Sequence, residues 1–202
     1  YANVATIGLL VHGTLFERVY LDMEGAIQVG KSSESPYGTR NPHLATAGYL
    51  EAGYTHPGNV PFRIGLFGTG ASGDAEPRDV PGNDRAVGFI PLFPSSHRYW
   101  GSMDVVSWTN LVSFGARAEV TPLSMLTIEM LYHEFYAADD RAAVPGIGQA
   151  GRPPLVEMGR HLAREIDLRL VLTPAAWAHA EVGYSVLLPQ AGGEAYKGVA
   201  DS

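Results

Sequence analysis

The amino-acid sequence predicts an all-β fold, an antiparallel up-and-down transmembrane β-barrel, from three observations. Hydrophobic residues recur with a period of two along most of the chain, which is typical of strands. The alternating segments are about 10–14 residues long, and a tilted strand crosses a bilayer with roughly 9–11. Tight turns alternate with long polar loops between these segments, which is the plan of an outer-membrane barrel.

The composition is compatible with this fold and excludes several other classes of protein. Of the 202 residues, 46% are hydrophobic, so the chain is too apolar to be disordered. The 24 glycines and 14 prolines exclude a coiled coil. A net charge of −7 argues against nucleic acid as the main partner. The absence of cysteine excludes disulfides, and no apolar run reaches the length of a transmembrane helix.

About eight strands are expected in chain order, joined alternately by tight turns and long loops. The strands are residues 3–12, 19–30, 43–54, 61–70, 107–120, 125–137, 160–173 and 177–188. The tight turns are residues 13–18, 55–60, 121–124 and 173–176. The long loops are residues 31–42, 71–106 and 138–159. Tight turns belong at the periplasmic end of such a barrel and long loops at the outer end.

Four strands alternate clearly enough to show which side chains share a face. On the second strand the apolar face is Val19, Leu21, Met23, Ile27 and Val29. On the fifth it is Phe114, Ala116, Ala118 and Val120, and on the eighth Ala180, Val182, Tyr184 and Val186. On the seventh we expect lipid-facing side chains at Leu162, Ile166, Leu168, Leu170 and Leu172. Aromatic girdles are expected from Tyr20, Tyr54, Phe62, Tyr132, Tyr136, Trp177 and Tyr184, which lie near strand ends.

The order of the connections predicts that residues 1–202 are a single section of a larger barrel. Because the first and last connections are both short, the two ends of the chain would lie outside the cell. Complete bacterial barrels usually have both termini on the periplasmic side. We therefore expect at least one further strand at each end.

One stretch of the longest loop and two later strands resemble a known family. The sequence Phe-Ile-Pro-Leu-Phe-Pro-Ser-Ser-His-Arg-Tyr-Trp-Gly-Ser-Met-Asp, residues 89–104, precedes Trp108-Thr-Asn110-Leu111. This run, the Arg-Glu-Ile-Asp-Leu strand at 164–168 and the Gly-Tyr-Ser at 183–185 resemble the alginate-export family of outer-membrane β-barrels. The resemblance implies a larger barrel in the bacterial outer membrane, embedded in its lipid, that passes polysaccharide or related solutes without catalysis.

Charged residues on the alternating polar faces are the candidate pore lining. They are Asp22, Glu24, Glu51, Arg63, Arg117, Glu119, Glu129, Glu165, Asp167, Arg169 and Glu181. One interpretation is a charged constriction that selects solutes, and the other is a ladder of ion pairs that stiffens the wall. Because acids outnumber arginines, this lining would repel a polyuronate and favour cations or neutral solutes.

The end of the longest loop and the start of the strand that follows it contain the densest cluster of aromatic and polar groups. Its members are His97, Tyr99, Trp100, Asp104, Trp108 and Asn110. In one interpretation the loop folds inward, narrows the pore and offers rings that stack on sugar faces. In the other the cluster only anchors the loop, with Trp100 and Trp108 at the membrane interface.

No catalytic residue, metal site or cofactor is predicted. The seven histidines are scattered and form no metal-binding pattern. The acidic loop at 73–84 could take calcium but matches no EF-hand, so a solvated loop is favoured.

The sequence therefore favours an outer-membrane channel of the alginate-export type for polysaccharide or small hydrophilic solutes. The main alternative is a soluble β-rich carbohydrate-binding domain or hydrolase, in which Glu119 and Glu129 would be acid and base. A third is a structural barrel with partners in a larger envelope complex.

Overall fold

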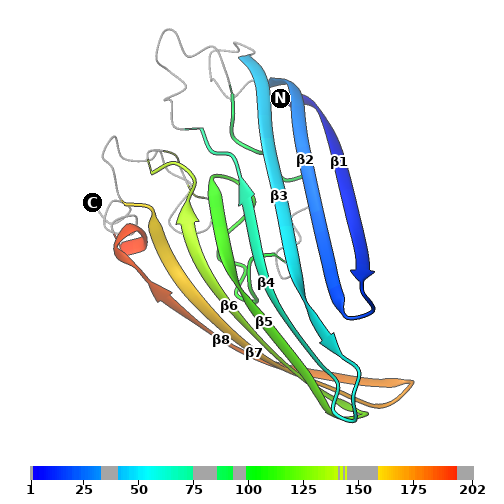
Figure 1. Cartoon of the computed structure of the whole chain (residues 1–202). Helices are drawn as coiled ribbons and strands as arrows, with labels where there is room; N and C mark the ends of the chain where they lie inside the picture. The colour runs from blue at the N-terminus through cyan, green and yellow to red at the C-terminus, as the bar shows by residue number, and fades with distance from the viewer. Residues whose placement is uncertain are drawn as a thin grey trace.

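Eight antiparallel strands form one curved sheet in the computed structural model, which describes residues 2–32, 41–74, 86–92, 99–140, 142, 144 and 159–194 (Figure 1). Each strand pairs with its neighbours in chain order, so the topology is up-and-down. The strands are β1 (Ala2–Leu15), β2 (Val19–Ser32), β3 (Asn41–His56), β4 (Phe62–Ala71), β5 (Leu111–Leu123), β6 (Leu126–Ala137), β7 (His161–Ala175) and β8 (Ala178–Pro189). The predicted all-β, antiparallel fold is confirmed.

The strands are long, as the alternating pattern predicted. They contain between 10 and 16 residues. At about 3.3 Å per residue, even the shortest spans roughly 33 Å, enough to cross an apolar band about 25 Å tall when tilted. The largest difference from the prediction is at β5, which begins at Leu111 rather than at residue 107. Asn110 ends the preceding irregular segment with a left-handed φ of 52°.

Tight turns gather at one end of the sheet, and the strand ends that the long connections join lie at the other (Figure 1). Phe16 and Glu17 join β1 to β2 with φ values of 51° and 63°, the left-handed conformation that hairpins use to match strand twist. Two residues separate the paired Leu123 and Leu126, and two separate Ala175 and Ala178. The predicted alternation of turns and loops is therefore present.

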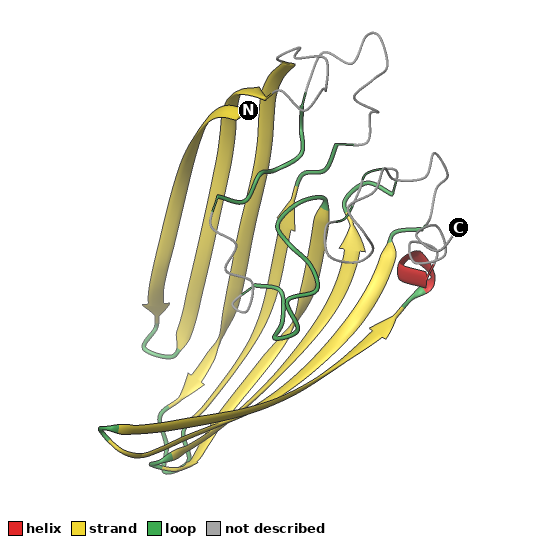
Figure 2. Cartoon of the chain, turned by 180° about the vertical axis from the view of Figure 1, so that it is seen from behind, coloured by secondary structure: helices red, strands yellow, loops and turns green. Residues whose placement is uncertain are grey.

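The sheet is curved but open. Within the described residues β1 pairs only with β2, and β8 only with β7 (Figure 2). The curvature and the two free edges are compatible with a section of a larger barrel. The expectation of further strands on both sides remains a prediction.

The convex face of the sheet is apolar and exposed. Every strand contributes at least one large hydrophobic side chain that is 36–67% exposed: Leu9, Met23, Leu50, Ile64, Phe114, Met130, Leu168 and Val182. A soluble β-sandwich would bury such a face against a second sheet. In the described part of the chain no second sheet covers it, so the fold favours the membrane interpretation.

No helix among the described residues has both the length and the apolar character needed to span a membrane.

A β-bulge at the start of β7 overturns one predicted orientation. Phe135 pairs with Ala163, but Tyr136 pairs with His161, so Leu162 is an extra residue. Leu162 is 1% exposed and belongs to a buried cluster with Phe135, so it does not face lipid. Because of this extra residue, His161 and Leu162 face the opposite sides of the sheet from those that the alternation of the later residues predicts. After the bulge, the side chains predicted to face lipid are exposed on the convex face: Ile166, Leu168, Leu170 and Leu172.

A compact polar group lies beside the bulge on the convex face, and the sequence analysis did not predict it. Glu134 accepts hydrogen bonds from the Tyr132 hydroxyl and from Arg164 Nε at 2.9 Å, and it contacts His161. The His161 ring stacks on Tyr136 with ring centroids 4.6 Å apart. Charges beside lipid are normally paired in this way, and the aromatic rings suit the predicted girdle.

Candidate functional site

The residues 86–92 and 99–110, here called the inner loop, lie over the concave face of the sheet (Figure 2). Trp100 is 2% exposed and belongs to a buried cluster with Leu111, Phe135 and Leu162. At the other end Phe89 packs in a second cluster of buried residues: Ala45, Ala47 and Ala71. The hydrophobic clusters of this protein therefore lie between the loop and the wall.

Polar contacts hold the inner loop to strands distant in sequence. Gln28, which is fully buried, accepts the Ile90 N–H at 2.9 Å and donates to the Ile90 carbonyl at 2.6 Å. Trp108 Nε1 donates to Thr69 Oγ1 at 2.9 Å, and the Tyr99 hydroxyl donates to Glu24. These bonds reach β2 and β4, so the loop spans the concave face rather than projecting outward.

The loop aromatics pack mainly on one another. The Tyr99 and Trp108 rings stack with centroids 4.8 Å apart and planes 16° apart, and Trp100 meets Trp108 edge-on at 6.0 Å. Trp100 and Trp108 therefore lie inside the curved sheet, which contradicts the interpretation that placed them at the membrane interface. Asn110 anchors the neighbouring loop, because its side-chain amide donates to the Asp139 and Ala142 carbonyls at 2.8 Å. His97 lies outside the described residues.

A turn at residues 101–104 rests on two acids of β7. The Ser102 N–H donates to Asp167 Oδ2 at 3.2 Å, and the Met103 N–H donates to Glu165 Oε1 at 3.0 Å. Gly101 has φ +80°, and a Cβ there would lie 2.2 Å from Glu165 Oε1. Asp104 is also left-handed, with φ 53°. Successive N–H groups in such a turn form an anion-binding nest, here filled by the wall's own carboxylates.

A ladder of ion-paired side chains crosses the concave face below the inner loop. It contains one residue from each strand in order: His12, Asp22, Glu51, Arg63, Arg117, Glu129, Arg169 and Glu181. We call it the charge ladder. Each arginine lies between two acids. Arg63, for example, is 3.4 Å from Asp22 and 3.3 Å from Glu51. The arginine side chains are 18–41% exposed, so water and salt weaken each ion pair. The whole network therefore stabilises the wall more than any single pair does.

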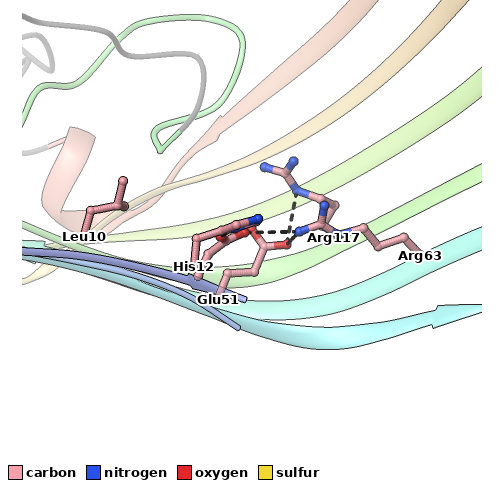
Figure 3. A pocket seen from close by; sticks show the side chains of 6 residues that line it. Leu10, His12, Glu51, Arg63 and Arg117 are labelled. Carbon is pink, nitrogen blue, oxygen red and sulfur yellow. Dashed lines mark hydrogen bonds and ion pairs between the residues drawn. The ribbon is translucent and has the colours of Figure 1, made fainter. Parts of the chain in front are cut away.

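Glu51 is the most connected acid of the charge ladder. It is 2% exposed and accepts hydrogen bonds from Tyr20 at 2.7 Å and from Tyr49. The Arg63 guanidinium lies 3.6 Å from the centre of the Tyr20 ring, a cation–π contact. A cavity of about 420 Å³ opens beside this cluster (Figure 3). It is lined by Leu10, His12, Asp22, Glu51, Arg63 and Arg117.

Two glycines give the Tyr20 ring room to lie flat on the wall. A Cβ at Gly53 would be 2.5 Å from the ring, and a Cβ at Gly65 would be 2.0 Å from the hydroxyl. We expect Gly65→Ala to destabilise the protein by roughly 1–3 kcal/mol, because Tyr20 must leave Glu51. Urea unfolding of the full-length protein in detergent micelles measures this.

Gly25→Ala is the matched control for that substitution, since a Cβ at Gly25 would meet nothing within 4 Å. Equal stability of the two variants would show that Tyr20 is not held by the space at Gly65.

The structure brings the predicted lining residues to one face. Eight of the eleven belong to the charge ladder or contact Tyr99: Asp22, Glu24, Glu51, Arg63, Arg117, Glu129, Arg169 and Glu181. Glu119 lies on the same face, because the strand register places it directly opposite Arg63 on β4 and Glu129 on β6. Glu165 and Asp167 lie under the inner loop instead of facing open space. Sequence reasoning missed Gln28 as a partner, and it wrongly assigned Tyr20 to an aromatic girdle. Both side chains are buried and lie on the same alternating face of β2 as Asp22.

The comparisons with known proteins agree with this geometry. No curated protein matches the chain. The sequence model of the alginate export family, however, matches residues 2–202 of the chain. That family comprises transport channels of the bacterial outer membrane rather than enzymes. With its all-β sheet, apolar convex face and charged concave face, this chain belongs to the alginate export family.

Proposed function

We propose that this chain forms part of the wall of an outer-membrane channel, through which polysaccharide or small hydrophilic solutes pass along the concave face. The observation that carries the proposal is the contrast between the two faces. The convex face exposes an apolar side chain on every strand, and the concave face carries the charge ladder from β1 to β8. This is the arrangement of a barrel with lipid outside and water inside.

The inner loop narrows this passage. It occupies the concave side at the level of Glu24, Gln28 and Glu165, above the charge ladder. Trp100 is a loop anchor, because a ring that is 2% exposed offers no face to a passing sugar. Tyr99 and Trp108 are half-buried and stack on each other, so they too stabilise the loop. The open cavity lined by Leu10 and Arg63 is the more accessible surface for a solute.

The passage favours cations and neutral solutes over anions. On the concave face the eight acids listed above outnumber the three arginines. In a narrow passage with low-dielectric walls such a field raises the local concentration of cations. The arginines are engaged by acids of the charge ladder, so none provides an unpaired positive charge.

Replacing Glu119 and Glu129 together with Gln is expected to shift the reversal potential of the full-length channel toward anions. The change removes two negative charges from the wall and leaves Arg117 and Arg169 less compensated. The shift should be largest at low salt, where screening is weak. The measurement is the reversal potential in planar bilayers under a KCl gradient.

Glu134→Gln is the control, because Glu134 lies on the convex face and its loss should leave the reversal potential unchanged. A wild-type channel that prefers anions and ignores the double substitution would overturn the proposed selectivity.

The alternative function as a glycoside hydrolase has a specific observation against it. Glu119 and Glu129 are direct partners across β5 and β6, close enough for a catalytic pair. However, Oε1 of Glu129 contacts Arg117 at 3.2 Å, and Oε2 accepts from Arg169 Nε at 2.7 Å. Both oxygens of Glu129 are therefore occupied by arginine side chains, and neither is available to a substrate or a water molecule.

A further inference from the structure

The cavity of about 420 Å³ beside the charge ladder has a lining that is balanced in charge (Figure 3). With His12 neutral, two acids, Asp22 and Glu51, face two arginines, Arg63 and Arg117. Both arginines contact Glu51, and Arg63 also contacts Asp22. A cation or an anion bound here would have to displace one member of an ion pair, which leaves a charge without its partner. The lining therefore suits a ligand that has no net charge.

Both arginines keep hydrogen-bond donors that the charge ladder does not use. Arg63 reaches Asp22 and Glu51 through Nη2, at 3.4 and 3.3 Å. Arg117 contacts Glu129 through Nη1 at 3.2 Å and Glu51 through Nε at 3.8 Å. Among the residues that the structure describes, no ion pair engages Nη1 of Arg63 or Nη2 of Arg117. A ligand oxygen in the cavity can accept from these two nitrogens while both ion pairs stay intact.

The edge of the cavity on β1 adds an acceptor and an apolar surface, and both are open to the passage. The side chain of His12 is 73% exposed, and its Nδ1 contacts Asp22. In the neutral ring with the Nδ1 hydrogen directed to that carboxylate, Nε2 is an acceptor. Leu10, two residues earlier on the same face of β1, is 62% exposed. Donors, an acceptor and an apolar contact therefore surround one open cavity.

We propose that this cavity is a binding subsite for an uncharged sugar unit. Sugar hydroxyls both donate and accept hydrogen bonds, so Arg63 and Arg117 donate to them and His12 accepts from them. Leu10 packs against the C–H groups of the sugar. The volume of about 420 Å³ lies within the roughly 300–1,000 Å³ of small-molecule pockets. This inference rests on the proposed channel function and specifies its cargo as a neutral oligosaccharide or polysaccharide rather than a polyuronate.

The concave face between the cavity and the tight turns carries uncharged hydroxyl groups. Thr14 lies two residues beyond His12 on β1, so it shares the face of the cavity. On β5 and β6 the hydroxyls of Thr121 and Thr127 are 3.3 Å apart, and both side chains are half-buried. A neutral sugar chain can exchange hydrogen bonds with such hydroxyls along its way, because they donate and accept as its own hydroxyls do.

Two variants remove the proposed sugar contacts without changing the charge of the wall. Arg63→Lys together with Arg117→Lys keeps both positive charges, but each planar guanidinium becomes one ammonium group, which the neighbouring acids engage. His12→Ala removes the acceptor, and the exposure of this side chain makes a loss of folding unlikely to follow from it. Arg164→Lys is the matched control, since it makes the same chemical change on the convex face.

The experiment measures how neutral and acidic oligosaccharides block the K⁺ current of the full-length channel in planar bilayers. The probes are maltohexaose, cellohexaose and a guluronate oligomer of equal length. We expect a neutral hexamer to half-block the wild type at a concentration about tenfold or more below that of the uronate. Its half-blocking concentration should stay constant between about 0.1 M and about 1 M KCl, because screening does not weaken the binding of a neutral ligand.

The cavity variants should need about tenfold more of the neutral hexamer for the same block, as expected when hydrogen bonds to the sugar are lost. Their reversal potential should equal that of the wild type, and Arg164→Lys should be blocked as the wild type is. A channel that conducts but is blocked best by the uronate, or by none of the probes, would refute the sugar subsite and leave the channel function intact. Block that is unchanged in both cavity variants would refute it too. A full-length protein that inserts but conducts nothing, in any variant, would refute the channel function and the subsite together.

Discussion

Leu9→Arg is expected to destabilise the folded protein by about 2–4 kcal/mol, because a lipid-facing cation near the membrane midplane loses its hydration. Leu10→Arg, one residue further along the same strand, should cost less than about 1 kcal/mol. Both leucines lie near the middle of β1 and both are 62% exposed, so exposure alone does not distinguish them. They differ in the face that they occupy.

The register of β1 assigns those faces. Leu10 pairs with Glu24 and lines the concave cavity with Asp22 and Glu51, whose carboxylates would attract a new arginine. Leu9 pairs with Gly25 on the convex side. Urea unfolding of the full-length protein in lipid vesicles measures the two costs. Equal costs would mean that the convex face does not meet lipid.

The strands could be predicted from the sequence because alternation is a local signal. A strand with one face in lipid and the other in water must change polarity at every residue, and β2 does so at Leu21, Asp22, Met23 and Glu24. The clustering of glycine and proline between such segments then predicts the turns. The ends of strands are less predictable, as at Asn110, because a side-chain hydrogen bond to Asp139 stops β5 there.

The orientation of Leu162 could not be predicted, since a single inserted residue leaves the composition of a strand unchanged. The signal was present but weak. Leu162 and Ala163 are adjacent apolar residues that break the alternation, and Arg164 shares the phase of the lipid-facing leucines. Only the pairing of Tyr136 with His161 shows where the extra residue lies.

The candidate site was predictable as a set of residue types but not as a set of partners. Alternation places Arg63 and Asp22 on polar faces, yet their contact joins residues 41 positions apart. Which acid meets which arginine depends on the stagger between strands, and that is set by all the turns together. The contact of Met103 with Glu165, 62 positions apart, depends in addition on the path of the inner loop.

Trp100→Ala is expected to release the inner loop without unfolding the sheet. Trp100 is 2% exposed and packs in the buried cluster with Leu111 and Phe135, so its truncation should cost roughly 3–5 kcal/mol. The hydrogen-bonded ladders of the strands do not depend on this ring. Local opening therefore costs less than global unfolding, and the loop should detach first. Circular dichroism of the full-length protein should keep its β signal while conductance rises and the loop becomes sensitive to protease.

Leu92→Ala is the matched control, because Leu92 belongs to the same loop and is 57% exposed. Its truncation should change stability by less than about 0.5 kcal/mol and leave the conductance at the wild-type value. If Trp100→Ala abolished the β signal, the loop and the sheet would be a single cooperative unit. If it left conductance and protease sensitivity unchanged, the inner loop would not be what narrows the passage. An increase in conductance that appears only with Trp100→Ala places the constriction in the residues that pack around this ring.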